Sequence, residues 1–333
     1  KATLQKIIRD AVEQISEFSL EDYIEFSGSS PKDTLFLSER FLIPYDLLAG
    51  IGHRGVYVST NQRYSIVLNA SEHLVMRSIY GGLQVEKVWD TLNWMDDCLC
   101  KNLDYMTDSR LGYLTSDLSL VGTGLKIFAG LHLPGLARIG NLPLWEEKMK
   151  LHGFYLKGIK AGAPPSRAIS ISKHIIDQGF HSSIGEPVTT GVIETAGSLF
   201  VVGNSYTLGV SEPEIVFSLA HILGEIVKAE NEARERLINS SRITLEDMVG
   251  RAEGVAKGAR FIEFGEGVEL WSALQIGNNH NLLSTPIKSS LWELFFEIQG
   301  GHIISELAST FNGTNTIKVS LHRANKFKSI FEN

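Results

Sequence analysis

The stretch GYLTSDLSLVGTGLKIFAGLHLP, residues 112–134, decides how this chain folds. It passes through a turn-prone linker to the glycines of Gly122-Thr123-Gly124 and continues into an apolar run, 125–133, which we expect to be a β-strand. The glycines indicate a tight turn, because they match neither a Walker loop nor a G-x-G-x-x-G sequence that opens a helix. Lys126 is expected on the strand beyond this turn, either as a solvated lysine or as a cation for a bound phosphate.

Helix and strand patterns surround this stretch on both sides. Strands are predicted at 23–26, 56–58, 64–68, 73–80, 154–157 and 198–203. Apolar residues at spacings of three and four predict helices at 4–18, 85–103, 144–151 and 213–239. After residue 241 every pattern is helical, with segments 245–255, 268–276, 291–298, 303–311 and 317–331. We therefore predict an α+β domain over 1–245 followed by an all-α domain over 246–333.

Composition excludes several classes of protein. The chain has 333 residues, 43% of them hydrophobic, which is enough for about two packed domains. A net charge of −7 argues against a nucleic-acid partner, and no apolar run is long enough to span a membrane. The two cysteines, Cys98 and Cys100, are too few for a disulfide framework or a four-ligand zinc site. A reduced, cytoplasmic location is the simplest expectation.

Motifs for metal binding or hydrolysis are missing from the sequence. No two histidines have the spacing of a metal-binding pair, and no G-x-S-x-G sequence occurs, so we predict no metal site and no Ser-His-Asp hydrolysis. His132 lies in an apolar run, where a hydrogen-bonded core histidine is the more common role. The charged cluster 230–236 has helical spacing and is expected to be a solvated face.

Five ordered blocks resemble the ATP:guanidino phosphotransferase family, which includes creatine, arginine and bacterial protein-arginine kinases. GYLTS (112–116), GTGLK (122–126) and LHLP (131–134) follow the family run G-Y-L-T-S-C-P-T-N-x-G-T-G-L-R … L-H-L-P without a gap. NASEHL (69–74) is similar to the family's N-E-E-D-H-L, and 198–212 resembles its N-I-F-x-I-S-N-x-x-T-L-G-x-S-E block. EARE (232–235) and SRITLED (241–247) resemble the protein-arginine kinases in particular.

The resemblance implies a fold and a set of partners. The fold is α+β, with a large antiparallel sheet flanked by helices in a guanidino-kinase catalytic-type domain, followed by a helical dimerisation-type domain. The implied partners are an arginine-rich protein or an activator-type adaptor, and a second copy of the chain bound through the C-terminal helices. The implied cofactor is ATP or ADP with Mg²⁺, bound weakly if at all in the region of Lys126, Lys157 and His132.

Several family positions carry other residues here. The family's catalytic base falls on Ser71, which has no negative charge, and a phosphate-binding arginine falls on Val75. The reactive cysteine falls on Asp117, and the arginine after G-T-G-L falls on Lys126, which keeps the charge without the bidentate fork. If the N-E-E-D-H block is a strand, Glu72 and Ser71 point to opposite faces, so Glu72 cannot simply replace the base.

The second phosphate motif aligns less directly. Its Arg-Gly aligns with Lys157-Gly158, and an alignment with Thr190-Gly191 is the alternative. With the first alignment, about thirty residues, 160–193, are inserted into the loop that closes over substrate in relatives. The phosphoarginine-sensing motif R-D-x-x-R-A keeps only Arg323-Ala324.

These departures leave three hypotheses. The first is a degenerate protein-arginine kinase, a pseudokinase that binds a protein partner and retains at most weak nucleotide affinity. The second is an active protein-arginine kinase with a rebuilt site, in which Asp117 supplies the carboxylate and Glu72 is a weaker candidate. The third is a docking subunit that acts through the inserted loop 160–193.

Overall fold

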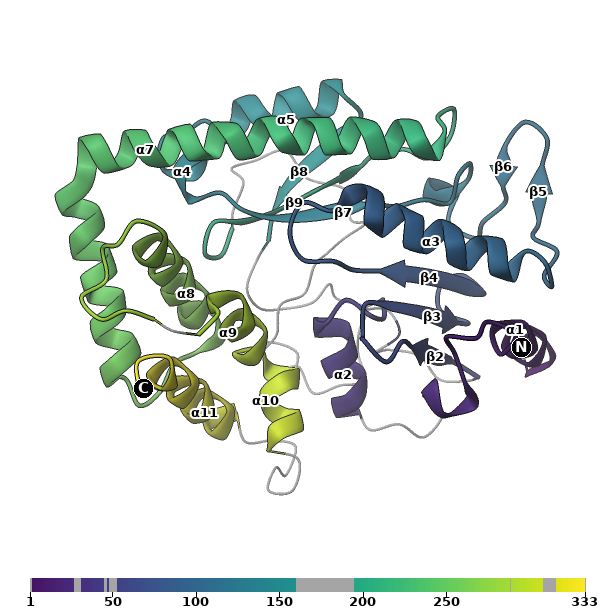
Figure 1. Cartoon of the computed structure of the whole chain (residues 1–333), viewed down its shortest axis with the longest axis horizontal. Coiled ribbons are helices and arrows are strands. Elements are labelled where there is room, and N and C mark those ends of the chain that lie inside the picture. The colour runs from purple at the N-terminus through teal and green to yellow at the C-terminus, as the bar shows by residue number, and fades with distance from the viewer. Residues whose placement is uncertain are drawn as a thin grey trace. The chain divides into compact units, whose positions relative to one another are not determined.

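The computed structural model describes residues 2–26, 31–44, 47, 53–159, 195–287, 289–307 and 316–332 (Figure 1). The chain divides into two compact units. The first comprises 1–128, 152–154 and 203–223, and the second comprises 129–151, 155–202 and 224–333. The predicted insertion 160–193 lies outside the described residues.

The first unit is built around a four-stranded antiparallel sheet with the order β1-β2-β3-β4. Its strands are β1 (Tyr23–Glu25), β2 (Gly55–Val58), β3 (Tyr64–Leu68) and β4 (Leu74–Ser78). The helices of this unit are α1 (Ala2–Val12), α2 (Pro31–Glu39) and α3 (Val85–Leu99). Two short strands, β5 (Thr107–Asp108) and β6 (Gly112–Tyr113), form a separate hairpin, and the 3₁₀ helix η3 (Leu118–Leu120) follows it.

Alternating side chains give this sheet two buried faces. Tyr57 and Ile66 pair across β2 and β3 and pack in a core with residues of α1 and α3. Their neighbours Val56 and Val67 point the other way and pack with Leu37 of α2 in a second core. Because both faces are covered, these strands are apolar along most of their length.

The second unit combines a small sheet with helices. The sheet has the order β7-β9-β8, with β7 (Phe128–His132), β8 (Phe154–Gly158) and β9 (Leu199–Asn204). Two helices, α4 (Pro134–Arg138) and α5 (Leu142–Leu151), connect β7 to β8. The later elements are all helical: α7 (Glu212–Gly258), whose residues 212–223 are counted with the first unit, and then α8 (Phe264–Asn279), α9 (Leu291–Glu297), α10 (Gly300–Glu306) and α11 (Thr316–Ser329).

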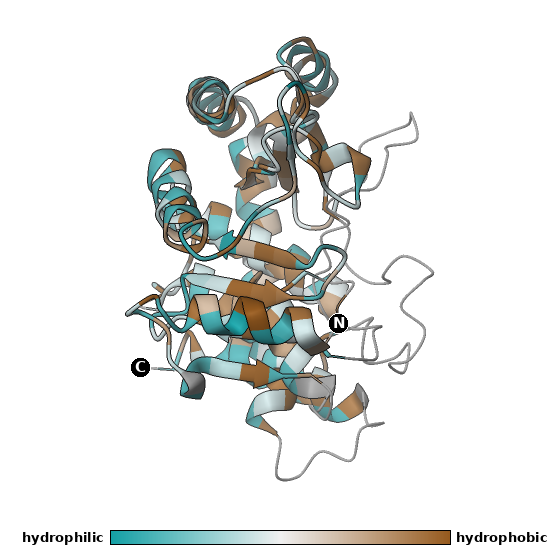
Figure 2. Cartoon of the chain, turned by 90° about the vertical axis from the view of Figure 1, so that its right-hand side faces the viewer, coloured by the Kyte–Doolittle hydropathy of each residue, from teal (hydrophilic) through white to brown (hydrophobic). Residues whose placement is uncertain are grey.

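Helix α8 is the centre of the helical part. Most of its residues are buried, and Trp271 makes ring contacts with Trp292 and Phe295. Arg323 of α11 is also fully buried, and its guanidinium donates to the carbonyls of Ile298 and Ile262. Helices elsewhere carry hydrophilic and hydrophobic residues on different sides, as the amphipathic patterns predict (Figure 2).

The α+β fold class is confirmed, whereas the strand expected over 125–133 is wrong in its extent. It is confined to β7, so Lys126 precedes the strand instead of lying on it. The helices expected at 213–239 and 245–255 are both present as the two parts of α7, which is interrupted by non-helical dihedral angles at Ser241. The domain division at 245/246 stays a prediction. Among the described residues, no helix has both the length and the apolar character that a membrane span needs.

Candidate functional site

The connection between β3 and β4 carries two of the predicted site residues, Ser71 and Glu72. Residues 69–73 form a turn between the two strands, so Ser71 and Glu72 are not strand residues. Asn69 begins the turn with a positive φ of 56°, and its side-chain amide donates to the carbonyl of His53 at 2.7 Å. Its backbone N–H donates to the carbonyl of His73 at 2.9 Å, which closes the turn. The argument that neighbouring side chains point to opposite faces of a sheet therefore does not apply to Ser71 and Glu72.

The carboxylate of Glu72 is bound by two successive backbone amides. Oε2 accepts from the N–H of Ser116 at 3.0 Å, and Oε1 accepts from the N–H of Asp117 at 2.9 Å. These bonds join the β3–β4 turn to the GYLTSD segment, 45 positions away along the chain. Glu72 therefore fixes the backbone that carries Asp117, and both of its oxygens are engaged in doing so.

Asp117 lies at the start of η3 with its side chain exposed. One carboxylate oxygen accepts from the N–H of Ser119 at 2.9 Å and caps the 3₁₀ helix. The charge of Asp117 raises the pKa of Lys126, but burial has the larger effect, and the net result is a lowered pKa for that ammonium. Within the described part of the chain, no carboxylate forms an ion pair with Lys126. The first unit thus brings Glu72, Asp117 and Lys126 together.

The Gly122–Gly124 turn is held by a threonine that the sequence analysis did not single out. Thr207 Oγ1 donates to the carbonyls of Ser119 and Val121 at 3.1 and 2.7 Å. Gly122 has a φ of 116°, and a Cβ atom there would lie 2.2 Å from the Thr207 carbonyl oxygen, so only glycine fits. This turn packs backbone against backbone, as expected for a tight turn.

Asn204 anchors the segment that contains Lys126. Its side-chain amide donates to the carbonyl of Leu125 at 2.9 Å, and its side-chain oxygen accepts from the N–H of Ile127 at 2.9 Å. Both Asn204 and Thr207 belong to the block 198–212 that carries the family resemblance. The family resemblance of that block is the only sequence signal for these two residues, and it assigns neither of them a role.

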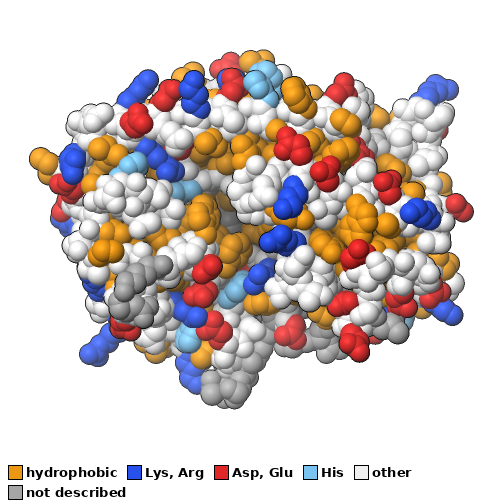
Figure 3. Space-filling model, viewed as in Figure 1, with side chains coloured by type: hydrophobic (Ala, Val, Ile, Leu, Met, Phe, Trp, Pro, Cys, Tyr) orange, Lys and Arg blue, Asp and Glu red, His pale blue; other side chains and the backbone are white. Residues whose placement is uncertain are grey.

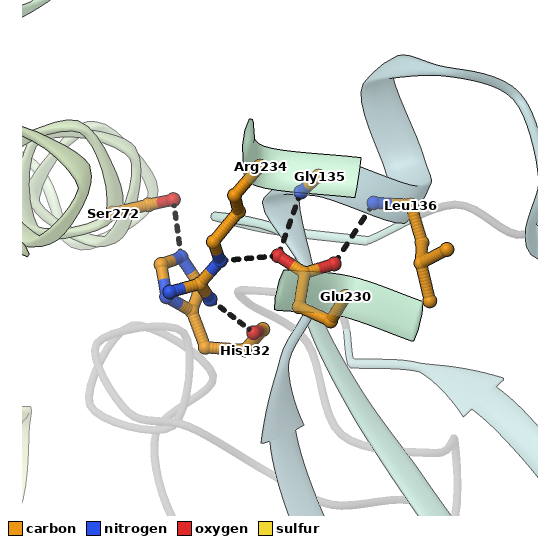
Figure 4. Close-up of polar contacts among 6 residues, drawn as sticks. All are labelled: His132, Gly135, Leu136, Glu230, Arg234 and Ser272. Atoms are coloured by element: carbon orange, nitrogen blue, oxygen red, sulfur yellow. Dashed lines mark hydrogen bonds and ion pairs between the residues drawn. The ribbon is translucent and has the colours of Figure 1, made fainter. Parts of the chain in front are cut away.

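His132 lies in a different place, on β7 in the second unit (Figure 4). Its ring is 9% exposed, forms a hydrogen bond with Ser272 Oγ at 2.8 Å, and lies 4.9 Å from the ring of Trp271. Burial, with a smaller contribution from the positive charge of Arg234, lowers the pKa of His132 to about 3. The imidazole is therefore neutral at physiological pH and offers no positive charge to a phosphate.

Next to His132, Glu230 and Arg234 of α7 form a polar network with the start of α4 (Figure 4). The carboxylate of Glu230 accepts from the N–H groups of Gly135 and Leu136, both at 2.8 Å. Arg234 donates to Glu230 and, at 2.9 Å, to the carbonyl of His132. The expectation of a solvated charged face is wrong for Glu230, which is 3% exposed, because α4 and β7 cover this side of α7.

Lys157 lies on β8, as predicted, in the second unit. Its ammonium is 4.7 Å from the ring centroid of Tyr155, which is a cation–π distance. Burial raises the pKa of the Tyr155 phenol to about 12, so this ring stays neutral. The predicted nucleotide residues are thus divided, with Lys126 in one unit and Lys157 and His132 in the other.

A resident metal ion needs several ligating side chains close together. In the ranges given above, no group of three or more His, Cys, Asp or Glu side chains is arranged to hold a metal ion. A Mg²⁺ ion that arrives with a nucleotide takes ligands from the phosphates as well as from the protein and does not depend on such a group.

Comparison with known proteins gives consistent matches. The family described as ATP:guanido phosphotransferase, C-terminal catalytic domain, matches residues 3–172. A protein-arginine kinase from Pelotomaculum thermopropionicum is 32% identical over 274 residues, which are 82% of this chain and 69% of that protein. A protein-arginine kinase from Bacillus cereus is 28% identical over 297 residues, or 89% of this chain and 75% of that protein.

Solved structures agree on the fold. The duplicated taurocyamine kinase from Schistosoma mansoni, with bound transition state analog components, superposes with a TM-score of 0.52 at 19% identity. The match covers 75% of this chain and 33% of that enzyme, so the chain spans about a third of the duplicated protein. At this level of identity, the likeness concerns the fold alone.

Proposed function

This chain belongs to the ATP:guanido phosphotransferase family, and we propose that it is a degenerate protein-arginine kinase homologue that binds a protein partner without phosphorylating arginine. The observation that carries the proposal is that Glu72, the carboxylate next to Ser71, is hydrogen-bonded to the backbone. By the family resemblance, Ser71 stands where the base belongs. The carboxylate of Glu72 is committed to the amides of Ser116 and Asp117.

The chemistry of transfer explains why this matters. Phosphoryl transfer to a guanidinium needs a carboxylate that orients and deprotonates the attacking nitrogen. A serine hydroxyl is a very poor base at neutral pH, and it does not attract a guanidinium by charge. The carboxylate of Glu72 is held by two backbone amides and cannot turn toward a substrate without breaking those hydrogen bonds.

The positive charges are also reduced. Charge that develops on the phosphates in the transition state is normally balanced by several cations. Val75 replaces an arginine by the family resemblance, and His132 is buried and neutral. Lys126 supplies one positive group beside the Gly122–Gly124 turn, which suits a weak contact with one phosphate of ATP or ADP. If a nucleotide binds, Lys126 would help to orient it through one phosphate, and no transfer to arginine is expected to follow.

A second candidate function is an active kinase that uses Asp117. Its carboxylate is exposed and close enough to Lys126 to affect the pKa of that ammonium, and Glu72 fixes its backbone. These features favour a carboxylate held at a defined position. They do not replace the charge lost at Val75. The docking role of the inserted loop concerns 160–193, outside the described residues, and stays a prediction.

The proposed setting of the protein is a reduced, cytoplasmic compartment. Its proposed partners are an arginine-rich protein or an activator-type adaptor, together with a second copy bound through the C-terminal helices. Cys98 and Cys100 are both free thiols, which suits such a compartment.

The test is an assay for phosphoarginine on an arginine-rich protein with Mg-ATP, read by mass spectrometry under neutral conditions. The unaltered protein is expected to give no signal above a control without enzyme. Phosphoarginine formation that disappears in Asp117→Ala would overturn the proposal in favour of the second candidate. Phosphoarginine that still forms with Asp117→Ala would overturn both the inactive homologue and the kinase that uses Asp117. Titration with Mg-ADP, measured separately, tests for residual nucleotide binding.

A further inference from the structure

Large apolar side chains reach the surface at several places on the face that Figure 3 shows. Among the described residues of the first unit, five exposed large apolar side chains belong to the β5–β6 hairpin, to η3 and to the loop after β9. We call this set the hairpin patch: Met106, Leu111, Leu114, Leu118 and Leu208. Met106 is 72% exposed and Leu118 is 85% exposed. Exposed apolar groups that gather on neighbouring segments are typical of an interaction surface.

Hydrogen bonds hold the segments of the hairpin patch together. The N–H of Leu114 donates to the carbonyl of Met106 at 2.9 Å, which places these two residues across the hairpin. Thr207, next to Leu208, donates to the carbonyls on either side of Leu120. Because the backbone is fixed in this way, a partner does not have to order the hairpin on binding, which lowers the entropic cost of association.

The anchored side of the hairpin is aromatic. Tyr105 and Tyr113 pack edge to face at 5.8 Å, and the Tyr113 hydroxyl donates to Asp96 of α3 at 3.5 Å. These tyrosines attach the hairpin to α3, whereas the leucines and Met106 are left exposed. The apolar groups of the hairpin patch therefore contribute little to the stability of the unit itself.

The segment that carries most of the hairpin patch is acidic. Residues 96–118 contain five aspartates and two basic residues. Asp104 precedes the hairpin and Asp108 ends β5, where the N–H groups of Arg110 and Leu111 lower the pKa of Asp108 and keep it ionised. A segment that combines acidic groups with exposed apolar groups is complementary to one that carries positive and apolar side chains.

We propose that the hairpin patch docks a basic, amphipathic segment of a partner protein, one in which arginine or lysine alternates with leucine-like residues. The proposal rests on the proposed function, because it names the surface through which a protein-binding homologue meets its partner. The apolar side chains of the segment would cover Met106 and Leu118, and its cations would lie near Asp104 and Asp108. No phosphoryl transfer is involved.

The experiment uses the full chain and a fluorescein-labelled 14-residue peptide that alternates arginine and leucine. Binding is measured by fluorescence anisotropy without nucleotide. The double variant Met106→Ser/Leu118→Ser is expected to weaken binding at least about tenfold, since each side chain loses apolar burial. Asp104→Asn is expected to weaken it by about twofold to fivefold and to reduce its dependence on salt.

A matched control lies in the second unit. Leu144 and Leu151 of α5 are exposed to a similar degree, so Leu144→Ser/Leu151→Ser removes an equivalent pair and is expected to leave binding unchanged. A peptide with glutamate in place of arginine, and one with serine in place of leucine, are expected to bind much more weakly. Absence of binding, an equal loss in both double variants, or equal binding of the glutamate peptide would overturn the proposal.

The phosphoarginine assay separates this proposal from the proposed function. A failure of the docking test leaves the result of that assay unaffected. Conversely, arginine phosphorylation by the unaltered protein would overturn the pseudokinase proposal while the peptide measurements stand. Far-UV circular dichroism of each variant confirms that the exposed substitutions leave the fold intact.

Discussion

Two glutamates in this protein make the same pair of contacts in different surroundings. Glu72 accepts from the successive amides of Ser116 and Asp117, and Glu230 accepts from those of Gly135 and Leu136. Glu72 is partly exposed, whereas Glu230 is 3% exposed and also forms an ion pair with Arg234. We therefore expect the same local geometry to contribute differently to the free energy of unfolding in the two units.

A carboxylate bound by backbone amides therefore stabilises the fold by an amount that depends on how deeply it is buried. In water-accessible surroundings the amides and the carboxylate can exchange their bonds for bonds to solvent, so little free energy is lost. In a buried network, removal of one member leaves the others without partners, and the desolvation cost remains. Glu230 thus holds α4 against α7, while Glu72 sets the position of a loop.

The largest effect is expected for Glu230→Gln, which removes the charge and keeps the shape. Arg234 would be left in a largely buried site without its carboxylate, so we expect the free energy of unfolding to fall by about 3 kcal/mol. Urea denaturation at pH 7.5 measures this change.

Glu232 on the same helix provides the control, because its side chain is exposed. Glu232→Gln is expected to change the free energy of unfolding by no more than about 0.5 kcal/mol. A loss of less than about 1 kcal/mol in Glu230→Gln would contradict the contrast between the two glutamates.

The second effect concerns pH and the histidine that Arg234 also contacts. The unfolded chain takes up a proton at His132 near pH 6.5, whereas the folded protein does not until about pH 3. Between these values the unfolded state binds more protons, so stability is complete above pH 6.5 and falls as the pH is lowered. From pH 7.5 to 5 the loss from this group is about 2 kcal/mol.

Chemical denaturation of the unaltered protein and of His132→Gln at both pH values isolates this contribution. The variant is less stable at pH 7.5, but it is expected to lose about 2 kcal/mol less on acidification. Equal losses in the two proteins would show that His132 is protonated in the folded state, and the second unit would then lack the neutral, buried network that distinguishes it from the first.

The sequence predicts the fold better than it predicts either network. The strands β2, β3 and β4 follow from short apolar runs, and α3 and α8 follow from regular helical spacing. The sequence patterns do not predict helix α4, because five residues make less than two helical turns and are too few for the apolar spacing to repeat. Amphipathic spacing identifies local structure, since it depends on residues within a few turns of one another.

The site depends on contacts that no local pattern records. Glu230 and Gly135 are 95 positions apart, and His132 and Ser272 are 140 positions apart. A helical charge cluster looks the same in sequence whether solvent or another element covers it, so Glu230 was assigned to a solvated face. The family resemblance identified Asp117 and Ser71 as departures, but it gave no indication that Glu72 would be bound by the backbone next to Asp117.

The smallest of the three effects is expected for Glu72→Gln. Its hydrogen bonds are partly exposed and lack a neighbouring buried cation, so the free energy of unfolding should fall by about 0.5–1 kcal/mol. The local consequence is larger than the global one, because the amide of glutamine can accept through only one of its two terminal atoms. Hydrogen exchange at the N–H groups of Ser116 and Asp117 should therefore accelerate by about tenfold relative to the rest of the first unit.

Ser71→Ala is the matched control, because Ser71 lies in the same turn and its side chain is exposed. This substitution is expected to leave both the free energy of unfolding and the hydrogen exchange at 116–117 unchanged. Faster exchange confined to 116–117 would establish Glu72 as the residue that positions Asp117. If Glu72→Gln instead lowers the free energy of unfolding as much as Glu230→Gln does, then burial does not determine how much such a carboxylate contributes to stability. The turn that carries Ser71 would then have to be counted as part of the core.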